Sequence, residues 1–287
     1  MIIAKTIDEA RKVIWQWKAE GLTIGLCPTM GYLHEGHISL MEASKKENDK
    51  TVASLFVNPM QFGPTEDLAK YPRDFERDRA MMEACGVDMV FAPEASEMYA
   101  EDFCTFVDMT IVSETLCGKS RPVMFRGVCT VLTKLINIVY PNRMYMGKKD
   151  AQQLAVVRRM VRDLNFNIEV VGCPTIREED GLAKSSRNSY LAPEERKAAH
   201  ILSQALRLAQ DAIAAGQRNS ASIIALIKTK ILSEPLAEID YVEAVDGLSM
   251  QHVETLSDGD LVPIAVKIGT TRLIDNFTVG DPPIEVK

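Results

Sequence analysis

Two histidines follow the first strongly apolar run of the chain at a spacing that suits phosphate chemistry. The run PTMGYLHEGH spans residues 28–37 and places His34 and His37 three residues apart at the expected start of a helix. That spacing stacks both imidazoles on one helix face. Gly36 lets a phosphate approach backbone N–H groups that a helix start leaves without partners. The pattern predicts a phosphate site. The alternative is that the glycines only shape a turn and the histidines only cap the helix.

A second segment, DGLAKSSRN at residues 180–188, gathers two hydroxyls and two cations on an expected loop. Ser185 and Ser186 can donate hydrogen bonds, while Lys184 and Arg187 can neutralise charge that grows on phosphate oxygens. Taken alone, such a run is more often a solvated surface loop. Together with the histidine pair, it resembles the two marks of the nucleotidylyltransferase superfamily, which includes the class I aminoacyl-tRNA synthetases.

Further polar side chains follow two other expected strands. Asn58 and Gln61 offer amide donors and acceptors, which suit a hydroxy acid. The run GKKD at residues 147–150 opens a helix that carries Gln153 one turn further on. The alternatives are a turn residue for Asn58, and a solvated charge and a helix cap within the GKKD run.

The elements that must position these residues alternate between short apolar runs and longer helical patterns, which is typical of βαβ units around a parallel sheet. An opening helix is marked by the capping-box spacing of Thr6 and Glu9, and it ends at Gly21. Strands are expected near residues 22–27, 51–57, 87–92, 143–146 and 167–172, and helices near 74–85, 128–139 and 150–164. The pattern predicts an α/β fold with a Rossmann-like doubly wound parallel sheet, whose ligands lie at the carboxyl ends of the strands.

A second, smaller domain is expected after the run Cys173-Pro174-Thr175, where a polar stretch begins. We predict a nucleotide- and substrate-binding domain over residues 1–175 and an α+β domain over residues 176–287 that carries the KSSR loop at its start. Its expected elements are helices near 193–215 and 220–232, and strands near 239–245, 262–268 and 273–277.

Composition narrows the class of protein. With 46% hydrophobic and 25% charged residues, the 287-residue chain is typical of a globular rather than a disordered protein. A formal net charge of −7 argues against binding to nucleic acid, which relies on clustered Lys and Arg. We expect a cytoplasmic protein that does not enter membranes, because the charged N-terminal segment does not fit a secretory signal and no run approaches a membrane span. The six cysteines form no C-x-x-C pair, so reduced thiols are expected and no metal ligands are assigned.

Over most of its length, the sequence resembles the pantothenate synthetases, a family of pantoate–β-alanine ligases. The resemblance rests on PTMGYLHEGH, SLFVNPMQFGPTEDLAKYPRDFERD, MFRGVCTVLTKL, GKKDAQQL and REEDGLAKSSRN, which occur in the family's order. It implies an ATP-dependent ligase that condenses (R)-pantoate with β-alanine through a pantoyl adenylate. AMP and pyrophosphate would be released, and the product would be the precursor of coenzyme A. It further implies a homodimer and Mg²⁺ bound with ATP.

The resemblance also implies which residues surround each ligand. Gln61 and Gln153 would hold pantoate, with Gln61 also next to the β-alanine position, and we assign Asn58 as a third substrate-binding residue. His34, His37 and Lys149 would stabilise charge on the reacting phosphoryl group, because the pantoate carboxylate is already ionised and needs no protein nucleophile. ATP would be bound by Met30, Gly31, Tyr32, Leu33, His34, Glu35, Gly36, His37, Gly147, Lys148, Lys149, Asp150, Ile176, Lys184, Ser185, Ser186 and Arg187.

Two positions depart from the family pattern. Many members have Met or Leu at the position of Lys184, so this ammonium group is not expected to be essential. Glu is common at the position of Lys148, which leaves Lys149 as the better catalytic cation.

Three other functions are compatible with parts of the pattern. A nucleotidylyltransferase shares H-x-G-H, but the amides at Asn58, Gln61 and Gln153 suit an uncharged diol and a carboxylate better than a phosphate. The short, acidic chain disfavours an aminoacyl-tRNA synthetase. A nucleotide-binding regulator without turnover is the remaining alternative.

Overall fold

The computed structural model describes residues 1–64 and 66–286 and divides into two compact units. The first unit comprises Met1–Lys148 and Val156–Pro174, and the second comprises Lys149–Ala155 and Thr175–Lys287. The predicted domains, a nucleotide- and substrate-binding domain over residues 1–175 and a smaller domain over residues 176–287, stay a prediction.

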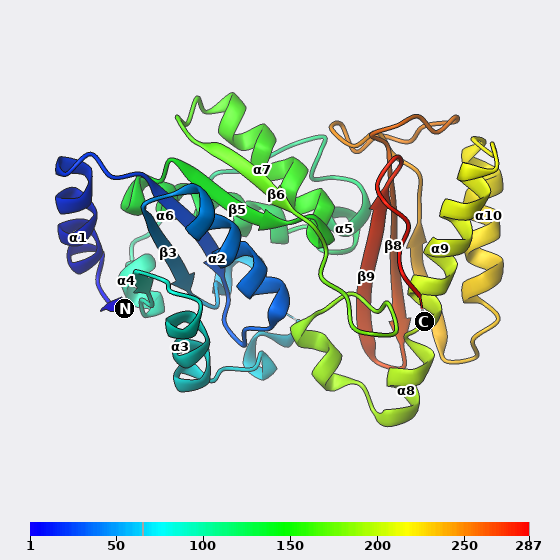
Figure 1. Cartoon of the computed structure of the whole chain (residues 1–287), viewed down its shortest axis with the longest axis horizontal. Coiled ribbons are helices and arrows are strands. Elements are labelled where there is room, and N and C mark those ends of the chain that lie inside the picture. Colours follow the sequence, from blue (N-terminus) through cyan, green and yellow to red (C-terminus); the bar gives the residue numbers. More distant parts are fainter. Residues whose placement is uncertain (65, 287) are drawn as a thin grey trace. The chain divides into compact units, whose positions relative to one another are not determined.

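The first unit is built on a parallel sheet of six strands (Figure 1). The expected α/β class, with a doubly wound parallel sheet, is confirmed. Five of these strands were expected, but not β1, which has only three residues and pairs through Ile2 with Met89 at one edge of the sheet. In spatial order the strands are β1 (Ile2–Ala4), β4 (Met89–Phe91), β3 (Lys50–Leu55), β2 (Ile24–Thr29), β5 (Arg143–Gly147) and β6 (Glu169–Cys173).

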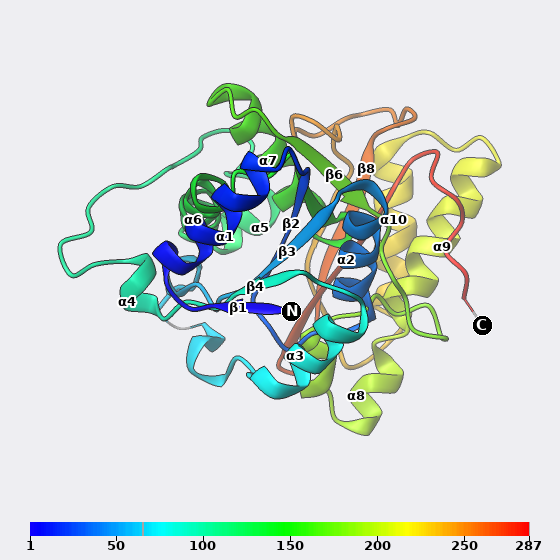
Figure 2. The ribbon, with the colours of Figure 1, turned by 60° about the vertical axis from the view of Figure 1, so that its left-hand side comes forward.

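Helices cover both faces of this sheet, as parallel strands require. One face carries α1 (Ile7–Ala19), α6 (Met124–Val139) and most of α7 (Ala151–Asp163), and the other carries α2 (Glu35–Glu47) and α3 (Phe75–Ala84) (Figure 2). The capping box of α1 is present, because the Thr6 hydroxyl accepts from the Glu9 N–H and the Glu9 carboxylate accepts from the Thr6 N–H. Short helical segments complete the connections: η1 (Pro59–Gln61), η2 (Asp67–Lys70), α4 (Ala95–Met98) and α5 (Leu116–Ser120).

The strand order creates a topological switch point beside β2. From β2 the chain moves through β3 to β4, and it then returns through α6 to place β5 on the other side of β2. The segments that follow β2 and β5 therefore leave the sheet on either side of one crevice, where ligands of doubly wound sheets bind. The hydrophobic core between the sheet and the helices α2 and α3 includes the buried residues Cys27, Leu33, Met41, Val90 and Tyr145.

The second unit contains an antiparallel sheet with strand order β7 (Ala237–Val242), β8 (Leu261–Ile268) and β9 (Thr271–Thr278). The helices α9 (Ile201–Ala214) and α10 (Ser220–Ile231) pack against it (Figure 1) and bury Leu206 and Ile227. The smaller α+β character expected for this region is confirmed.

One expected helix of this unit is in fact two. The helical pattern over residues 193–215 is interrupted after α8 (Pro193–Ala198), before α9 begins at Ile201. The separate α8 carries Arg196 into ion pairs with Glu178 and Asp180. These partners lie in another segment of the chain, so the hydrophobic periodicity of residues 193–215 cannot predict the interruption. Among the described residues, no helix is both long and apolar enough to span a membrane.

Candidate functional site

The segment after β2 turns into α2 through two consecutive residues with left-handed backbone. Gly31 has a φ of 87° and Tyr32 a φ of 51°, and the second of these is unfavourable for a residue with a side chain. The N–H groups of Tyr32 and Leu33 donate to the carboxylate of Asp78. The chain then reaches His34, the N-cap of α2.

The two histidines of this segment lie against each other, with ring centroids 4.0 Å apart. The Gly36 N–H donates to His34 Nδ1 at 3.1 Å, and the His34 N–H donates to His37 Nδ1 at 3.2 Å. Because each Nδ1 accepts a backbone hydrogen, each neutral ring carries its own hydrogen on Nε2. The histidines therefore do cap the helix, as the alternative interpretation proposed, but they use only Nδ1 for this. The Nε2–H group of each ring is a hydrogen-bond donor.

Most backbone N–H groups of this loop already have hydrogen-bond acceptors within the protein. We expected the N–H groups at the start of the helix to lack partners, and this is wrong for Gly36, which donates to His34 Nδ1, and for His37, which donates to the His34 carbonyl at 2.8 Å. The N–H groups of Tyr32, Leu33 and His34, which precede the helix, also have acceptors, namely the Asp78 carboxylate and His37 Nδ1. The side chains of the loop are thus better placed than these N–H groups to contact a phosphate.

Buried polar groups fix the amide of Asn58, which has 1% of its surface exposed and caps η1. Its Nδ2 donates to the Gly127 carbonyl and to Gln61 Oε1, each at 3.1 Å. Its Oδ1 accepts from the Tyr99 hydroxyl at 2.8 Å and from the Met60 N–H at 3.3 Å. A carbonyl can only accept and an N–H can only donate, so Gly127 and Met60 determine which end of the amide is oxygen.

This orientation determines what Gln61 can offer a ligand. Since Gln61 Oε1 accepts from Asn58, the Gln61 amide presents Nε2, a donor, on its other side. That nitrogen lies 3.0 Å from the sulfur of Met30. In this orientation, Gln61 can donate a hydrogen bond to a ligand oxygen, for example that of a carboxylate or a hydroxyl.

Gly127, Arg121 and Tyr99 hold this turn, and none of them was among the predicted site residues. A Cβ at Gly127 would lie 2.3 Å from the Met60 carbonyl oxygen, so only glycine allows α6 to approach η1 this closely. The Arg121 guanidinium donates to the Gln61 carbonyl at 3.3 Å. Burial raises the pKa of the Tyr99 phenol, which keeps it protonated as a donor to Asn58. The MFRGV run contains Gly127, but the sequence offers no signal for Tyr99.

In the second unit, the KSSR loop follows a small turn that is closed by a single antiparallel bridge between Arg177 and Ala183. The Lys184 N–H donates to the Ile176 carbonyl at 2.9 Å, so Ile176 and Lys184 lie side by side. The Ser185 hydroxyl accepts from the Arg187 N–H at 3.3 Å and caps η4 (Ser186–Tyr190). Five predicted ATP residues of this unit therefore belong to one local structure: Ile176, Lys184, Ser185, Ser186 and Arg187.

An ionic network supports this loop from within the unit. Arg196 of α8 pairs with Glu178 at 2.8 Å and with Asp180 at 2.6 Å, and Asn188 donates to Glu178 at 2.9 Å. Burial opposes ionisation of both carboxyls, but hydrogen bonds from Arg196 prevail and lower the pKa of each. Both carboxylates stay ionised at neutral pH and fix the base of the loop.

The remaining predicted residues lie at the end of β5, in the short helix η3 (Lys148–Asp150) and in the first turn of α7. Lys148 ends the first unit, whereas Lys149, Asp150 and Gln153 belong to the second. The side-chain amide of Asn276 on β9 donates to the Lys149 carbonyl at 2.8 Å and fixes the backbone there. Lys149 and Gln153 are half-buried, and Asp150 is exposed.

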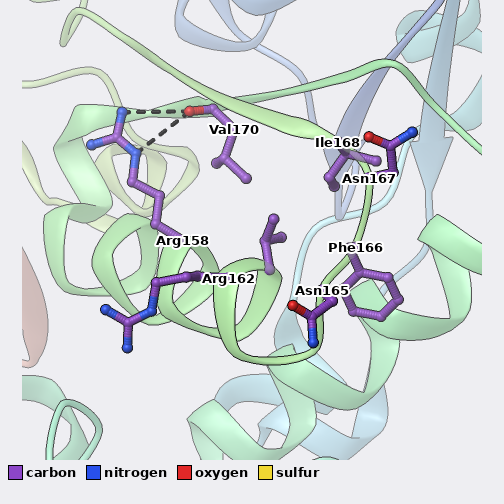
Figure 3. Close-up of a pocket in the computed structure, with 8 residues that line it drawn as sticks. Arg158, Arg162, Asn165, Phe166, Asn167, Ile168 and Val170 are labelled. Atoms are coloured by element: carbon purple, nitrogen blue, oxygen red, sulfur yellow. Dashed lines mark hydrogen bonds between the residues drawn. The ribbon is translucent and has the colours of Figure 1, made fainter.

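A cavity of about 510 Å³ is lined by residues of α7, of β6 and of the segment that joins them (Figure 3). Arg158 lines it, and its guanidinium donates to the Val170 carbonyl. None of the predicted ATP or substrate residues lines this cavity. Within residues 1–64 and 66–286, no group of three or more His, Cys, Asp or Glu side chains is gathered to hold a metal ion.

The doubly wound sheet, together with paired imidazoles and oriented amides after its strands, defines a class, the nucleotide-binding α/β enzymes. The family model for pantoate-beta-alanine ligase matches residues 2–278. The chain therefore belongs to the pantoate-beta-alanine ligase family.

Individual relatives agree with this assignment along nearly the whole chain. The pantothenate synthetase of Clostridium acetobutylicum is 59% identical over 278 residues, covering 97% of this chain and 99% of the relative. The crystal structure of pantothenate synthetase from Thermus thermophilus matches with a TM-score of 0.93 at 44% identity, over 97% of this chain and 99% of that one. The pantoate-beta-alanine ligase from Francisella tularensis, complexed with beta-gamma ATP and β-alanine, matches with a TM-score of 0.80 at 31% identity, over 99% of both chains.

Proposed function

We propose that this chain is an ATP-dependent ligase that joins (R)-pantoate to β-alanine, giving pantothenate, AMP and pyrophosphate. It thereby supplies the precursor of coenzyme A. The observation that carries the proposal is the similarity, over nearly the full length, to pantothenate synthetases and pantoate-beta-alanine ligases. The donor orientation of Gln61 supports it, because a hydroxy acid offers oxygen acceptors.

We assign the ligands to residues as follows. Gln61 and Gln153 hold pantoate, with Gln61 also beside β-alanine, and Asn58 acts by orienting the Gln61 amide. His34, His37 and Lys149 stabilise charge at the reacting phosphoryl group. ATP is bound by residues 30–37 and 147–150, by Ile176 and by residues 184–187.

The proposed reaction has two steps. A pantoate carboxylate oxygen attacks the α-phosphorus of ATP, the bond from this phosphorus to the bridging oxygen breaks, and pyrophosphate leaves. The amine of β-alanine then attacks the carbonyl carbon of the pantoyl adenylate, loses a proton and displaces AMP. Catalysis rests on positioning and on preorganised donors, namely the Nε2–H groups of His34 and His37 and the ammonium of Lys149.

Three further features belong to this proposal. Mg²⁺ enters with ATP, because this ion usually bridges substrate phosphates and keeps several waters; we assign it no protein ligand. Family resemblance supports a homodimer. A biosynthetic ligase of this kind acts on cytoplasmic metabolites, which supports a cytoplasmic location.

The direct test is an incubation of the purified protein with ATP, Mg²⁺, pantoate and β-alanine, followed by quantification of all products. Pantothenate, AMP and pyrophosphate are expected in equal amounts, and omission of either acid should abolish pantothenate. A stable nucleotidyl product in place of AMP would identify a nucleotidylyltransferase instead. ATP binding without any product would identify a regulator.

The orientation of Gln61 makes a sharp prediction about charge. Gln61→Glu keeps an oxygen toward Asn58 but replaces the Nε2 donor by a carboxylate oxygen that faces the pantoate carboxylate. We expect this variant to raise the KM for pantoate more than Gln61→Ala does, because repulsion adds to the loss of a hydrogen bond, which itself costs about 1–3 kcal/mol. Steady-state kinetics with varied pantoate measure the difference.

The comparison has a clear contrary outcome. If Gln61 instead accepted a hydrogen bond from a pantoate hydroxyl, Gln61→Glu would preserve that acceptor and outperform Gln61→Ala. Such a ranking would show that the amide is oriented the other way in the complex.

A further inference from the structure

A buried carboxylate anchors the loop that carries the two histidines. Asp78 lies on α3 and has 1% of its surface exposed. Its Oδ2 accepts from the Tyr32 N–H at 2.6 Å, and its Oδ1 accepts from the Leu33 N–H at 2.7 Å. Both oxygens of one carboxylate are thus bonded to consecutive backbone groups, which lie 46 and 45 residues away in sequence.

The loop needs such an anchor because of its backbone. Gly31 and Tyr32 are both left-handed, at φ values of 87° and 51°, and a residue with a side chain in this region stores strain unless its surroundings impose the conformation. A Cβ at Gly31 would lie 3.1 Å from Asp78 Oδ2, so the carboxylate also sits directly against this turn. The conformation of the turn and the position of Asp78 depend on each other.

Consecutive N–H groups in such a turn form an anion-binding nest. In this chain an internal carboxylate fills the nest, so the nest does not need to take a phosphate of the ligand. The next residue, His34, caps α2 and contacts His37 through a hydrogen bond from its own N–H. The hydrogen bonds from Tyr32 and Leu33 to Asp78 therefore fix the backbone just before His34, and with it the positions of both imidazoles.

We propose that Asp78 is a positioning residue for ATP: it holds the Tyr32 and Leu33 backbone so that the imidazoles of His34 and His37, rather than this nest, meet the nucleotide. This inference rests on the proposed function for the identity of the nucleotide. Asp78 itself is not expected to touch ATP. Arg77 lies 3.5 Å from Asp78 Oδ1 and partly balances its charge.

The test is Asp78→Asn, which preserves the shape of the side chain. An asparagine oxygen can accept from one of the two N–H groups, but its NH₂ group faces the other and cannot accept. We expect the Kd for MgATP, measured by calorimetry, and the KM for ATP to rise by about tenfold to a hundredfold, the usual range for a lost hydrogen bond to a charged group. The reaction of chemically supplied pantoyl adenylate with β-alanine should be unchanged within about twofold.

Asp74→Ala is the matched control. It removes the same charge from the same helix, because Asp74 is the exposed N-cap of α3 and accepts from the Arg77 N–H. Its Tm should fall, but its Kd for MgATP should stay near the wild-type value. If Asp78→Asn does not fold, Asp78→Glu keeps the carboxylate with displaced oxygens and should weaken MgATP binding selectively.

Two results would overturn the proposal. One is a Kd for MgATP in the Asp78 variant within about twofold of wild type. The other is an equal loss in ATP binding and in the β-alanine step, which would indicate a general loss of folded protein. A wild-type protein that binds MgATP but makes no pantothenate would refute the proposed function alone, and the same titrations would still test Asp78.

Discussion

His37→Asn is expected to slow formation of pantoyl adenylate by about a hundred- to a thousandfold, the usual loss for one preorganised donor at a reacting centre. The structure makes Asn the informative substitution. His37 Nδ1 accepts from the His34 N–H and completes the capping box of α2, and the asparagine oxygen can take over that role. The variant loses the Nε2 donor and the ring contact with His34. Single-turnover formation of the adenylate measures the rate, and a thermal melt should show nearly unchanged stability.

His37→Gln is the matched companion, because its amide reaches the Nε2 position and still offers a donor there. It should retain more of the adenylation rate than His37→Asn, although its helix cap is weakened, which costs about 1 kcal/mol of stability. Equal rates in both variants, with a lowered Tm in either, would reduce His37 to a capping residue. In both variants, chemically supplied adenylate should react with β-alanine at a much less affected rate.

Lys149→Gln is expected to have the second large effect, again about a hundredfold or more on adenylate formation, because we assign its ammonium group to the charge that develops at the α-phosphorus in the transition state. Asn276 donates to the Lys149 carbonyl and holds the backbone from which this side chain extends. The loss should appear in kcat rather than in the KM for ATP. Steady-state kinetics at saturating pantoate and β-alanine separate the two.

Lys148→Gln provides the comparison, since it removes the same charge from the neighbouring position. The family pattern tolerates Glu there, so its effect should stay below about tenfold, as for a charge with little transition-state specificity. A larger loss in Lys148→Gln than in Lys149→Gln would reverse our assignment of the catalytic cation.

Much of the fold could be predicted because its signals are local. The capping box at Thr6 and the alternation of apolar runs with helical patterns require only neighbouring residues, and they led to the doubly wound sheet. The missed features depend on distant contacts. The three-residue strand at Ile2 exists because it pairs with Met89, and the break before Ile201 separates a helix whose Arg196 binds carboxylates of another segment.

The candidate site shows the same division. Residue types and their places after the strands could be derived from the sequence, including His34, His37 and Gln61. Their orientation could not be derived, because it depends on hydrogen-bond partners that belong to no recognisable motif. Gly127 helps decide which end of the Asn58 amide is oxygen, and Asp78 accepts from the two N–H groups of the turn that leads to His34.

The central claim, an acid–amine ligase that works through an adenylate, is tested most directly by following oxygen. Pantoate labelled with ¹⁸O in both carboxylate oxygens is incubated with the enzyme, MgATP and unlabelled β-alanine, and the products are analysed by mass spectrometry. An adenylate route transfers one labelled oxygen to AMP and leaves the other in the amide carbonyl of pantothenate. Unlabelled AMP, or label in inorganic phosphate with formation of ADP, would contradict it.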